Sequence, residues 1–375
     1  MKVSTKYAAT IFALAAMLLA SCAKLETGGR VNSGDIPLSF SSYSPRPVSR
    51  VDAGSFVSGT SLPDSCSFGV FAYYQNGTIG SGTPAAWSAS RTPNFMFDQK
   101  VEYFEGDYNY DAVRYWPANE ENTISFWAYY PYSVYKTDNS GAVKLYSNEA
   151  CTAAYTSSSA GLPYVKYTVP SNPDNQVDLL FDSFTNKNRT YWNCTPTPGT
   201  VQFNFRHALS WVEFEIIEGT GAVINSMSVS DIKWSGVCTD IENRTWTNQG
   251  DVAPYSVSNV TVNSQIISSM LLIPQAIGDG VTLTINYDIT FESSDPGHPD
   301  PIVYKGNSGS VLLKDATLEN GTTPAGISAW EPGHHYIYKI RAGFERIEFE
   351  EIVDSVDDWI FWTDPYDPSN HEIDV

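Results

Sequence analysis

The sequence predicts an all-β protein, and three observations predict it. The chain contains 23 Tyr, 18 Phe and 10 Trp, and aromatic and β-branched residues fit a pleated sheet. Its 26 Gly and 22 Pro recur along the chain and leave little room for long helices. Apolar and polar residues alternate in several segments, which is the period of a half-buried strand.

The strands expected from this alternation differ in clarity. The clearest is 281–291, where aliphatic or aromatic residues stand at every odd position and polar residues between them. Further strands are expected at 68–74, at 124–130 and at 336–340, the last after a turn at Pro332-Gly333. Pro131 ends the second of these because proline cannot donate to a sheet ladder.

One segment changes the phase of its alternation. Apolar residues stand at odd positions in 201–205 and at even positions in 212–216, where Glu213 and Glu215 are expected to face out. A face with a period of two residues cannot change sides without an irregularity. The sequence therefore predicts a short turn or bulge between two strands near 207–210.

The N-terminus indicates export. Lys2 and Lys6 precede the apolar run 8–20, which has the length of a signal-peptide core and is shorter than the roughly 20 residues of a membrane span. The run ends in Leu19-Ala20-Ser21-Cys22, the pattern of a lipobox. Cleavage before Cys22 would leave its thiol and amino group to be acylated, for example with palmitate, and would anchor the mature chain by lipid. The alternative is an ordinary signal peptide followed by a chance cysteine.

Changes in composition suggest five segments. The stretch 195–200 is rich in Pro, Thr and Gly and resembles a linker, and the leader contains one short expected strand at 36–40. The expected segments are a signal peptide at 1–21, a leader at 22–50, an N-terminal β-rich domain at 51–196, a C-terminal β-rich domain at 197–362 and an acidic tail at 363–375.

Charge and cysteines limit the partners. The net charge of −20 becomes −22 when the signal peptide with Lys2 and Lys6 is removed. A chain this acidic does not bind nucleic acid or anionic lipid through charge. Besides Cys22 there are four single cysteines, which could form disulfides in three pairings or remain buried thiols: Cys66, Cys151, Cys194 and Cys238.

No motif for catalysis, a cofactor or a metal is found, so an enzyme is not expected. The sequence lacks GxSxG, HExxH and a phosphate-binding glycine loop. His207 is expected to be a core or turn residue hydrogen-bonded to backbone. His334 and His335 would face opposite sides of a strand and could not easily share a metal. The loop 293–300 is expected to be a solvated hairpin and not a calcium site.

Several short motifs, taken together, carry a resemblance to a known family. The chain resembles the fimbrillin family of Bacteroidales, the Mfa-like pilins and accessory fimbrial subunits, in motifs that follow the family's order over roughly residues 36–362. They are FGVFAY at 68–73, YWP at 115–117, ISFWAYYP at 124–131, DLL at 178–180, FRHAL at 205–209, LIPQ at 272–275, WEPGHHY at 330–336 and VDDW at 356–359.

The resemblance implies two tandem transthyretin-like β-sandwich domains and export as a lipoprotein. In stalk pilins of the family a protease cuts after an arginine near the N-terminus. The leader strand then leaves, and a C-terminal segment of another subunit fills the groove by strand addition. By position Arg50 is the preferred cleavage site here, Arg46 a second choice and Arg30 a weaker one. The alternative is that Arg46 and Arg50 are ordinary loop residues and the leader stays attached. Residues 344–362 would be the exchangeable region, or would complete their own sheet.

The expected function is therefore that of a structural or adhesive fimbrial subunit, lipid-anchored at the outer membrane and partnered by other fimbrial subunits. Whether it forms the stalk, the anchor or a tip that binds a host or bacterial surface ligand stays open. The alternative is a surface lipoprotein that never polymerises and binds glycan or another ligand. In that alternative, tryptophans would stack on sugar rings instead of filling the cores: Trp87, Trp116, Trp127 and Trp192.

Overall fold

The structure is a computed structural model that describes residues 35–43, 66–132, 143–189, 199–216, 222–258, 266–291, 297, 300–316, 327–342 and 347–355. In these residues the regular elements are β-strands and two short 3-10 turns, η1 (Pro173–Asn175) and η3 (Leu313–Asp315). The prediction of an all-β protein is confirmed. The described part of the chain contains no helix long and apolar enough to cross a membrane.

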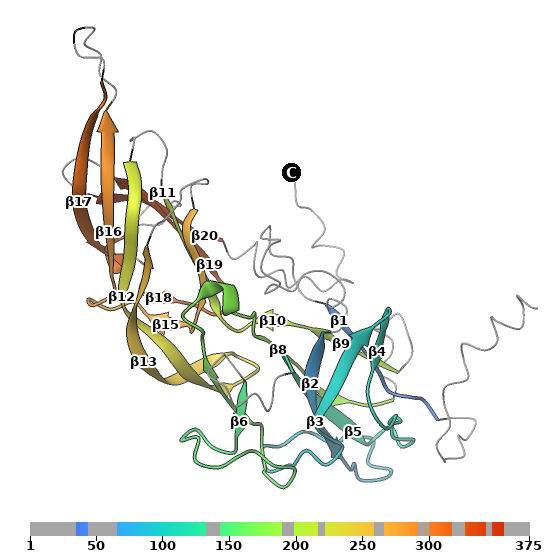
Figure 1. The fold of residues 1–375 in the computed structure, drawn as a ribbon. Coiled ribbons are helices and arrows are strands. Elements are labelled where there is room, and N and C mark those ends of the chain that lie inside the picture. Colours follow the sequence, from blue (N-terminus) through green and yellow to red (C-terminus); the bar gives the residue numbers. More distant parts are fainter. Residues whose placement is uncertain are drawn as a thin grey trace, which may run out of the picture. The chain divides into compact units, whose positions relative to one another are not determined.

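The first large sheet has six antiparallel strands, five of them from residues 67–187 and the sixth from residues 206–207 (Figure 1). Their order across the sheet is β10 (Arg206–His207), β8 (Leu180–Lys187), β5 (Thr123–Tyr130), β2 (Ser67–Gln75), β3 (Met96–Phe104) and β4 (Asp107–Asn109). Every residue of β5 is buried, and so are most residues of β2. Both faces of this sheet are therefore covered at its two central strands.

A short parallel pair covers one face of this sheet. β1 (Ser39–Tyr43) runs beside β9 (Thr200–Asn204) (Figure 1). Phe40 of β1 and Phe203 of β9 pack against Phe68 of β2 with ring centroids 6.3 and 5.7 Å away. Leader residues thus form part of the N-terminal core.

Two further sheets and a small pair come mainly from the C-terminal half, with two strands, at 144–146 and 164–168, contributed by the N-terminal half. One sheet has the order β14 (Ile266–Leu272), β11 (Ser210–Ile216), β19 (His335–Ala342) and β20 (Ile347–Ser355). The other has the order β17 (Ile302–Leu312), β16 (Thr282–Phe291), β12 (Ala222–Asp240), β7 (Tyr164–Thr168) and β6 (Lys144–Tyr146), with β13 (Thr245–Ser258) paired to β12. The small pair is β15 (Gln275–Ala276) with β18 (Ala329–Trp330).

The buried side chains of these sheets form one hydrophobic cluster. From β11 and β19 it includes Phe214 and Tyr338, stacked with centroids 5.2 Å apart, and from β16 it includes Leu283 and Ile285. Burial of this apolar surface is the main force that stabilises the fold. All described strands belong to one compact unit, residues 37–375.

The clearest expected strands are confirmed: β2, β5, β16 and β19 cover them. The predicted break is also confirmed, because the chain leaves strand geometry at Phe205 and at 208–209. Strand β7 pairs with β12, so the two halves share a sheet. The division into domains at 196/197 stays a prediction.

Two expectations are wrong in detail. The leader strand covers Ser39–Tyr43 and not 36–40, because Pro37 has no N–H for a ladder and makes only an isolated bridge with Tyr115. Glu213 does not face solvent but is 5% exposed. β11 is a central strand, and both of its faces are covered. The alternation of apolar and polar residues in this strand therefore does not mark a face that is open to solvent.

Candidate functional site: the leader slot

The N-terminal β1 occupies a slot in the N-terminal half, here named the leader slot. One wall is β9, to which β1 pairs from Ser39↔Thr200 to Tyr43↔Asn204. At the entrance, Leu38 N–H donates to the Arg114 carbonyl (2.8 Å) and Ser39 N–H donates to the Gly199 carbonyl (3.2 Å). The leader backbone is therefore held on both sides, although the ladder itself is short.

Alternate side chains of the leader point into the protein. Leu38, Phe40 and Ser42 are 2%, 4% and 3% exposed, while Ser39 and Ser41 between them are only half-buried. This is the period of two residues that a strand dictates. The slot therefore accepts two large apolar side chains followed by one small polar side chain.

Aromatic rings form the floor of the slot around Phe40. Its ring stacks on Phe203 (centroids 5.8 Å, interplanar angle 13°) and meets Tyr110 at 5.3 Å. Phe68 and Phe126 approach it edge-on, both at 6.3 Å. Such edge-on and stacked pairs each add roughly 0.5–1.5 kcal/mol to simple area burial. Phe40 is thus the main apolar anchor of the leader strand.

Hydroxyl groups hold the leader at three further points. The Tyr110 hydroxyl donates to the Leu38 carbonyl (2.7 Å), and burial raises the pKa of this phenol above its usual range. Ser42 Oγ and the Tyr108 hydroxyl lie 2.6 Å apart, and Ser39 Oγ lies 2.7 Å from Thr200 Oγ1. These bonds fix the register of the strand, because a slip of one residue would leave them unmade.

A buried carboxylate supports the β9 wall. Asp182 of β8 is 6% exposed and accepts a hydrogen bond from the Asn204 N–H (2.7 Å), and Asn204 is the ladder partner of Tyr43. Burial raises the pKa of Asp182 to about 7, although the backbone N–H groups of Ser183 and Asn204 and the charge of Arg206 oppose the shift. The end of the slot therefore contains a group that titrates near neutral pH.

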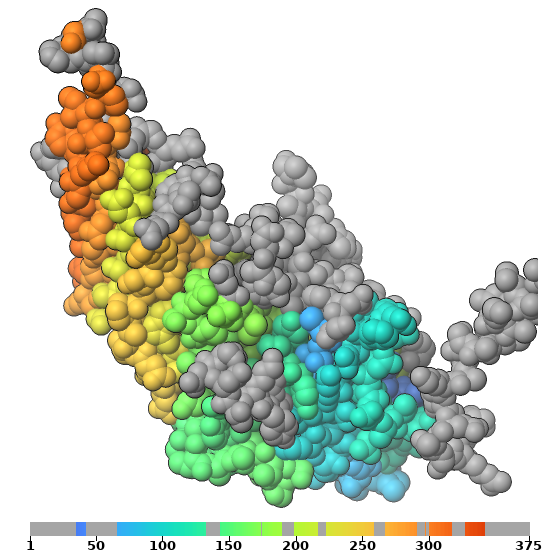
Figure 2. All heavy atoms as spheres, in the orientation of Figure 1, coloured from blue at the N-terminus to red at the C-terminus, as the bar shows by residue number. Residues whose placement is uncertain are grey.

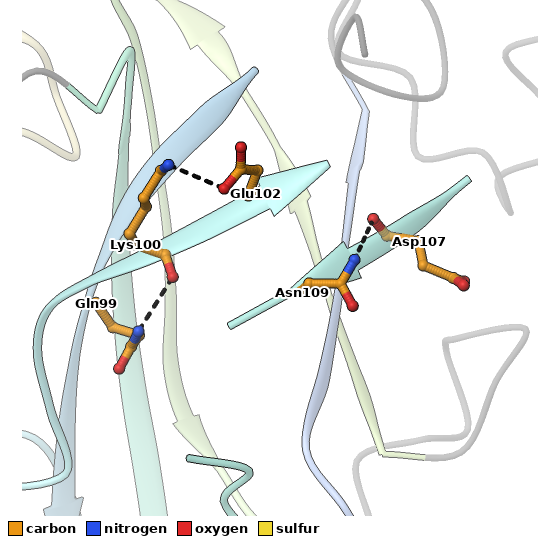
Figure 3. A network of polar contacts seen from close by, with 5 residues as sticks. All are labelled: Gln99, Lys100, Glu102, Asp107 and Asn109. Atoms are coloured by element: carbon orange, nitrogen blue, oxygen red, sulfur yellow. Dashed lines mark hydrogen bonds and ion pairs between the residues drawn. The ribbon is translucent and has the colours of Figure 1, made fainter. Parts of the chain in front are cut away.

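Strands β3 and β4 carry polar contacts of their own. Lys100 Nζ pairs with Glu102 Oε2 at 2.9 Å, Gln99 Nε2 donates to the Lys100 carbonyl, and Asn109 Nδ2 donates to the Asp107 carbonyl (Figure 3). The Lys100 and Glu102 side chains are 44% and 43% exposed. Such a surface pair contributes little to stability. Lys100 and Glu102 lie opposite Gly69 and Ser67 and not opposite Phe68, so this pair does not line the slot.

Most of the site residues expected from sequence lie outside the described residues. They are Cys22, Arg30, Arg46 and Arg50, together with 343–346 and 356–362 of the expected exchangeable region. The described remainder of that region is β20, which is the end strand of its sheet and pairs antiparallel with β19. The slot-lining residues Tyr108 and Tyr110 were not expected, and no local pattern marks them.

The two buried histidines pair with carboxylates. His207 is 1% exposed, as expected for a core residue, but its Nδ1 bonds the Asp178 carboxylate (2.9 Å) and not backbone. His335 Nε2 lies 2.7 Å from Glu213 Oε2, and its ring stacks on Trp211 with centroids 3.6 Å apart. Neither pair was expected. Each serves to satisfy a polar group that the sheets bury.

The cysteines and tryptophans that the structure describes have structural roles. Cys66, Cys151 and Cys238 are free thiols, and no group of three His, Cys, Asp or Glu side chains there could hold a metal. Trp116 and Trp127 are 6% and 1% exposed. Trp87 is half-buried and packs on Trp127 with centroids 4.7 Å apart. These three tryptophans fill cores, and Trp192 lies outside the described residues.

Comparison with known proteins identifies the family. The sequence model described as "Fimbrillin-like" matches residues 57–359, and the chain belongs to this family of fimbrial proteins.

Among curated proteins, the fimbrium subunit Fim1C of Phocaeicola vulgatus is 22% identical over 366 aligned positions, which cover 84% of this chain and 86% of that protein. A crystal structure of a fimbrial protein from Bacteroides vulgatus superimposes with a TM-score of 0.55 and 16% identity, covering 85% of this chain and 98% of that one. A cell adhesion protein from Bacteroides uniformis covers 88% and 100% at a TM-score of 0.47 and 15% identity. At 16% identity the Bacteroides vulgatus structure shows a shared fold.

Proposed function

We propose that this protein is a fimbrial subunit exported as a lipoprotein, acylated at Cys22, anchored in the outer membrane and assembled by strand complementation. Cleavage after Arg50, or after Arg46, would release the leader. The C-terminal region 344–362 of another subunit would then fill the vacated slot. Its partners are other fimbrial subunits, and it performs no catalysis.

The observation that supports this proposal most is the way β1 is held. It contributes a full set of buried side chains to the N-terminal core, yet it is a separate strand paired with β9 and lies N-terminal to both candidate arginines. Loss of β1 would remove Leu38 and Phe40 and expose the ring floor. Exposed apolar surface of this kind favours docking of a replacement strand.

The sequence of β20 supports the choice of donor. Ile347 and Phe349 have the spacing of Leu38 and Phe40, with an aliphatic residue two positions before a phenylalanine. β20 is the end strand of its sheet and pairs there with β19. Its exchange would therefore break one ladder, the one between β20 and β19. In a parallel docking, Ile347 and Phe349 of the donor would replace Leu38 and Phe40.

The test treats purified precursor with the matching outer-membrane arginine protease. Mass spectrometry would locate the cut, and gels of unheated samples would detect polymers. We expect cleavage after Arg50 followed by ladders, and neither in the Arg50→Gln variant, with Arg46→Gln as the matched control. A chain ending at Ala342 should be cleaved but form no ladders. Intact monomer throughout would contradict cleavage, and ladders from the shortened chain would contradict the donor assignment.

A further inference from the structure

Two long strands of the C-terminal half lie at the edges of their sheet. β13 pairs with β12, and β17 pairs with β16; within the described chain neither has a ladder on its other side. An edge strand presents backbone N–H and C=O groups that can pair with another chain. The two edges differ in how far their structure prevents this.

The β13 edge is blunted. Its ladder with β12 shifts register in three places, and Asn248 and Asp251 have positive φ angles of 46° and 52°. Pro254 lies in the same strand and has no N–H to offer. Bulges and proline are the devices by which proteins prevent edge-to-edge pairing.

The β17 edge is open by comparison. It contains no proline and one bulge, where Lys305 and Gly306 together oppose Asp288 and the Gly306 N–H donates to Asp288 Oδ1 (2.8 Å). Ile302, Val303 and Tyr304 are 54%, 44% and 41% exposed, so apolar side chains at this end of the strand are accessible to solvent. Figure 2 shows one side of β17 in orange. Consecutive exposed apolar residues on an edge strand mark an interaction surface.

The sequence of β17 points to the occupant. Read outward from the midpoint between Asn307 and Ser308, residue types are symmetric: a glycine lies on each side, then polar residues, then apolar residues at both ends. A strand with this symmetry complements its own copy in an antiparallel pair about a two-fold axis. Residues 301–314 also contain two lysines and no acid, in a chain of net charge −20, so negative charge on this strand does not oppose self-association.

We propose that β17 pairs antiparallel with β17 of a second copy of this chain, about a two-fold axis between Asn307 and Ser308. Beyond the bulge, Val303 of each copy faces Val311 of the other, and Ile302 faces Leu312. The six-stranded sheets of the two copies become one continuous sheet. This surface is separate from the leader slot, so uncleaved subunits, or subunits in neighbouring fimbriae, associate side by side.

Sedimentation of the uncleaved chain tests the proposal. In this chain β1 still fills the leader slot, so a dimer cannot arise by strand exchange into that slot. We expect the wild-type chain to shift from monomer to dimer as its concentration rises. Val303→Lys places a charge on the open edge and should weaken dimerisation by about tenfold or more. Val252→Lys is the matched control, since Val252 lies on the blunted β13 edge and is 57% exposed. A monomeric wild-type chain, or equal loss in both variants, overturns the proposal.

Cross-linking tests the axis independently. In the Asn307→Cys/Ser308→Cys variant the new cysteines of two copies would stand directly opposite, within the Cα separation that a disulfide spans. We expect a covalent dimer on mild oxidation, and none from the wild-type chain or from Val252→Cys/Ala253→Cys. Equal cross-linking in the two double variants, or none in Asn307→Cys/Ser308→Cys, rejects the two-fold pairing.

Discussion

The strands β1 and β17 are held in opposite ways. β1 spans five residues paired parallel to β9, and its inward side chains are almost fully buried. β17 spans eleven residues paired antiparallel to β16, and its first five residues are exposed. Side-chain burial therefore fixes β1, whereas backbone pairing fixes β17. A strand held by pockets can be replaced by any strand that fills them, and a strand held by its ladder stays in place and can extend it.

Phe40→Ala should have the largest effect on stability. Removing a buried ring from the floor of the slot costs about 3–5 kcal/mol in the free energy of unfolding, which urea denaturation of the uncleaved chain can measure. Val303→Ala in β17 should change stability by no more than about 0.5 kcal/mol, because its side chain is 44% exposed. Similar losses in both variants would show that the contrast between the strands is wrong.

Asp182→Asn should change how stability depends on pH. The pKa of Asp182 is raised to about 7 in the folded protein, above the usual value of about 4 for an unfolded chain. The folded state therefore binds this proton more tightly, and the wild-type chain loses stability as pH rises from about 4 to about 7.

Asp182→Asn cannot ionise and should lack this component of the loss, on the order of 4 kcal/mol. The measurement is the free energy of unfolding of both chains across this pH range. A difference between them that stays constant with pH would mean that Asp182 does not titrate there, and that the β9 wall is not sensitive to pH.

Ser42→Ala should have a moderate effect on the leader. It removes the hydrogen bond with the Tyr108 hydroxyl and should cost about 1 kcal/mol. Tyr108→Phe should cost a similar amount, and the double variant should cost less than the sum because both changes remove the same bond. Ser41→Ala, at the neighbouring half-buried position, serves as the control. Strict additivity would show that this bond does not hold β1.

Asp288→Ala should have the smallest effect, on the β16–β17 side of the comparison. It removes the acceptor for the Gly306 N–H at the bulge and should cost about 0.5 kcal/mol, since water can replace a bond at this partly exposed site. Asp288→Asn keeps an oxygen acceptor and should behave like the wild-type chain in thermal unfolding. A loss as large as that of Phe40→Ala would mean that the bulge, and not the ladder, holds β17.

Sequence patterns predicted the regular strands well and the irregular ones poorly. Alternation in 281–291 located β16, because one face of that strand is buried. The longest strand, β12, was not expected, because register shifts in its ladders break the period of two residues. Glu213 was assigned to solvent from the alternation of apolar and polar residues in 212–216. That local pattern contains no information about His335, which lies 122 positions away and pairs with Glu213.

The leader slot could be foreseen only in part. A short strand in the leader was expected, and its family resemblance suggested that it fills a groove. Its lining could not be predicted, because Tyr108 and Tyr110 lie far in sequence from Phe203 and from the leader, and only the fold assembles them. The resemblance supplied what periodicity could not, since a family pattern records long-range contacts that a local pattern does not contain.

The parallel pairing of β1 with β9 also bears on the order of folding. Ser39 leaves the ribosome early, yet its partner Thr200 follows 161 positions later. Contacts of such long sequence separation form late, because the entropy of closing a long loop opposes them. We therefore expect the first-made strand to dock last, onto strands that have already assembled, and hydrogen exchange during refolding should show its amides protected after those of β2 and β5.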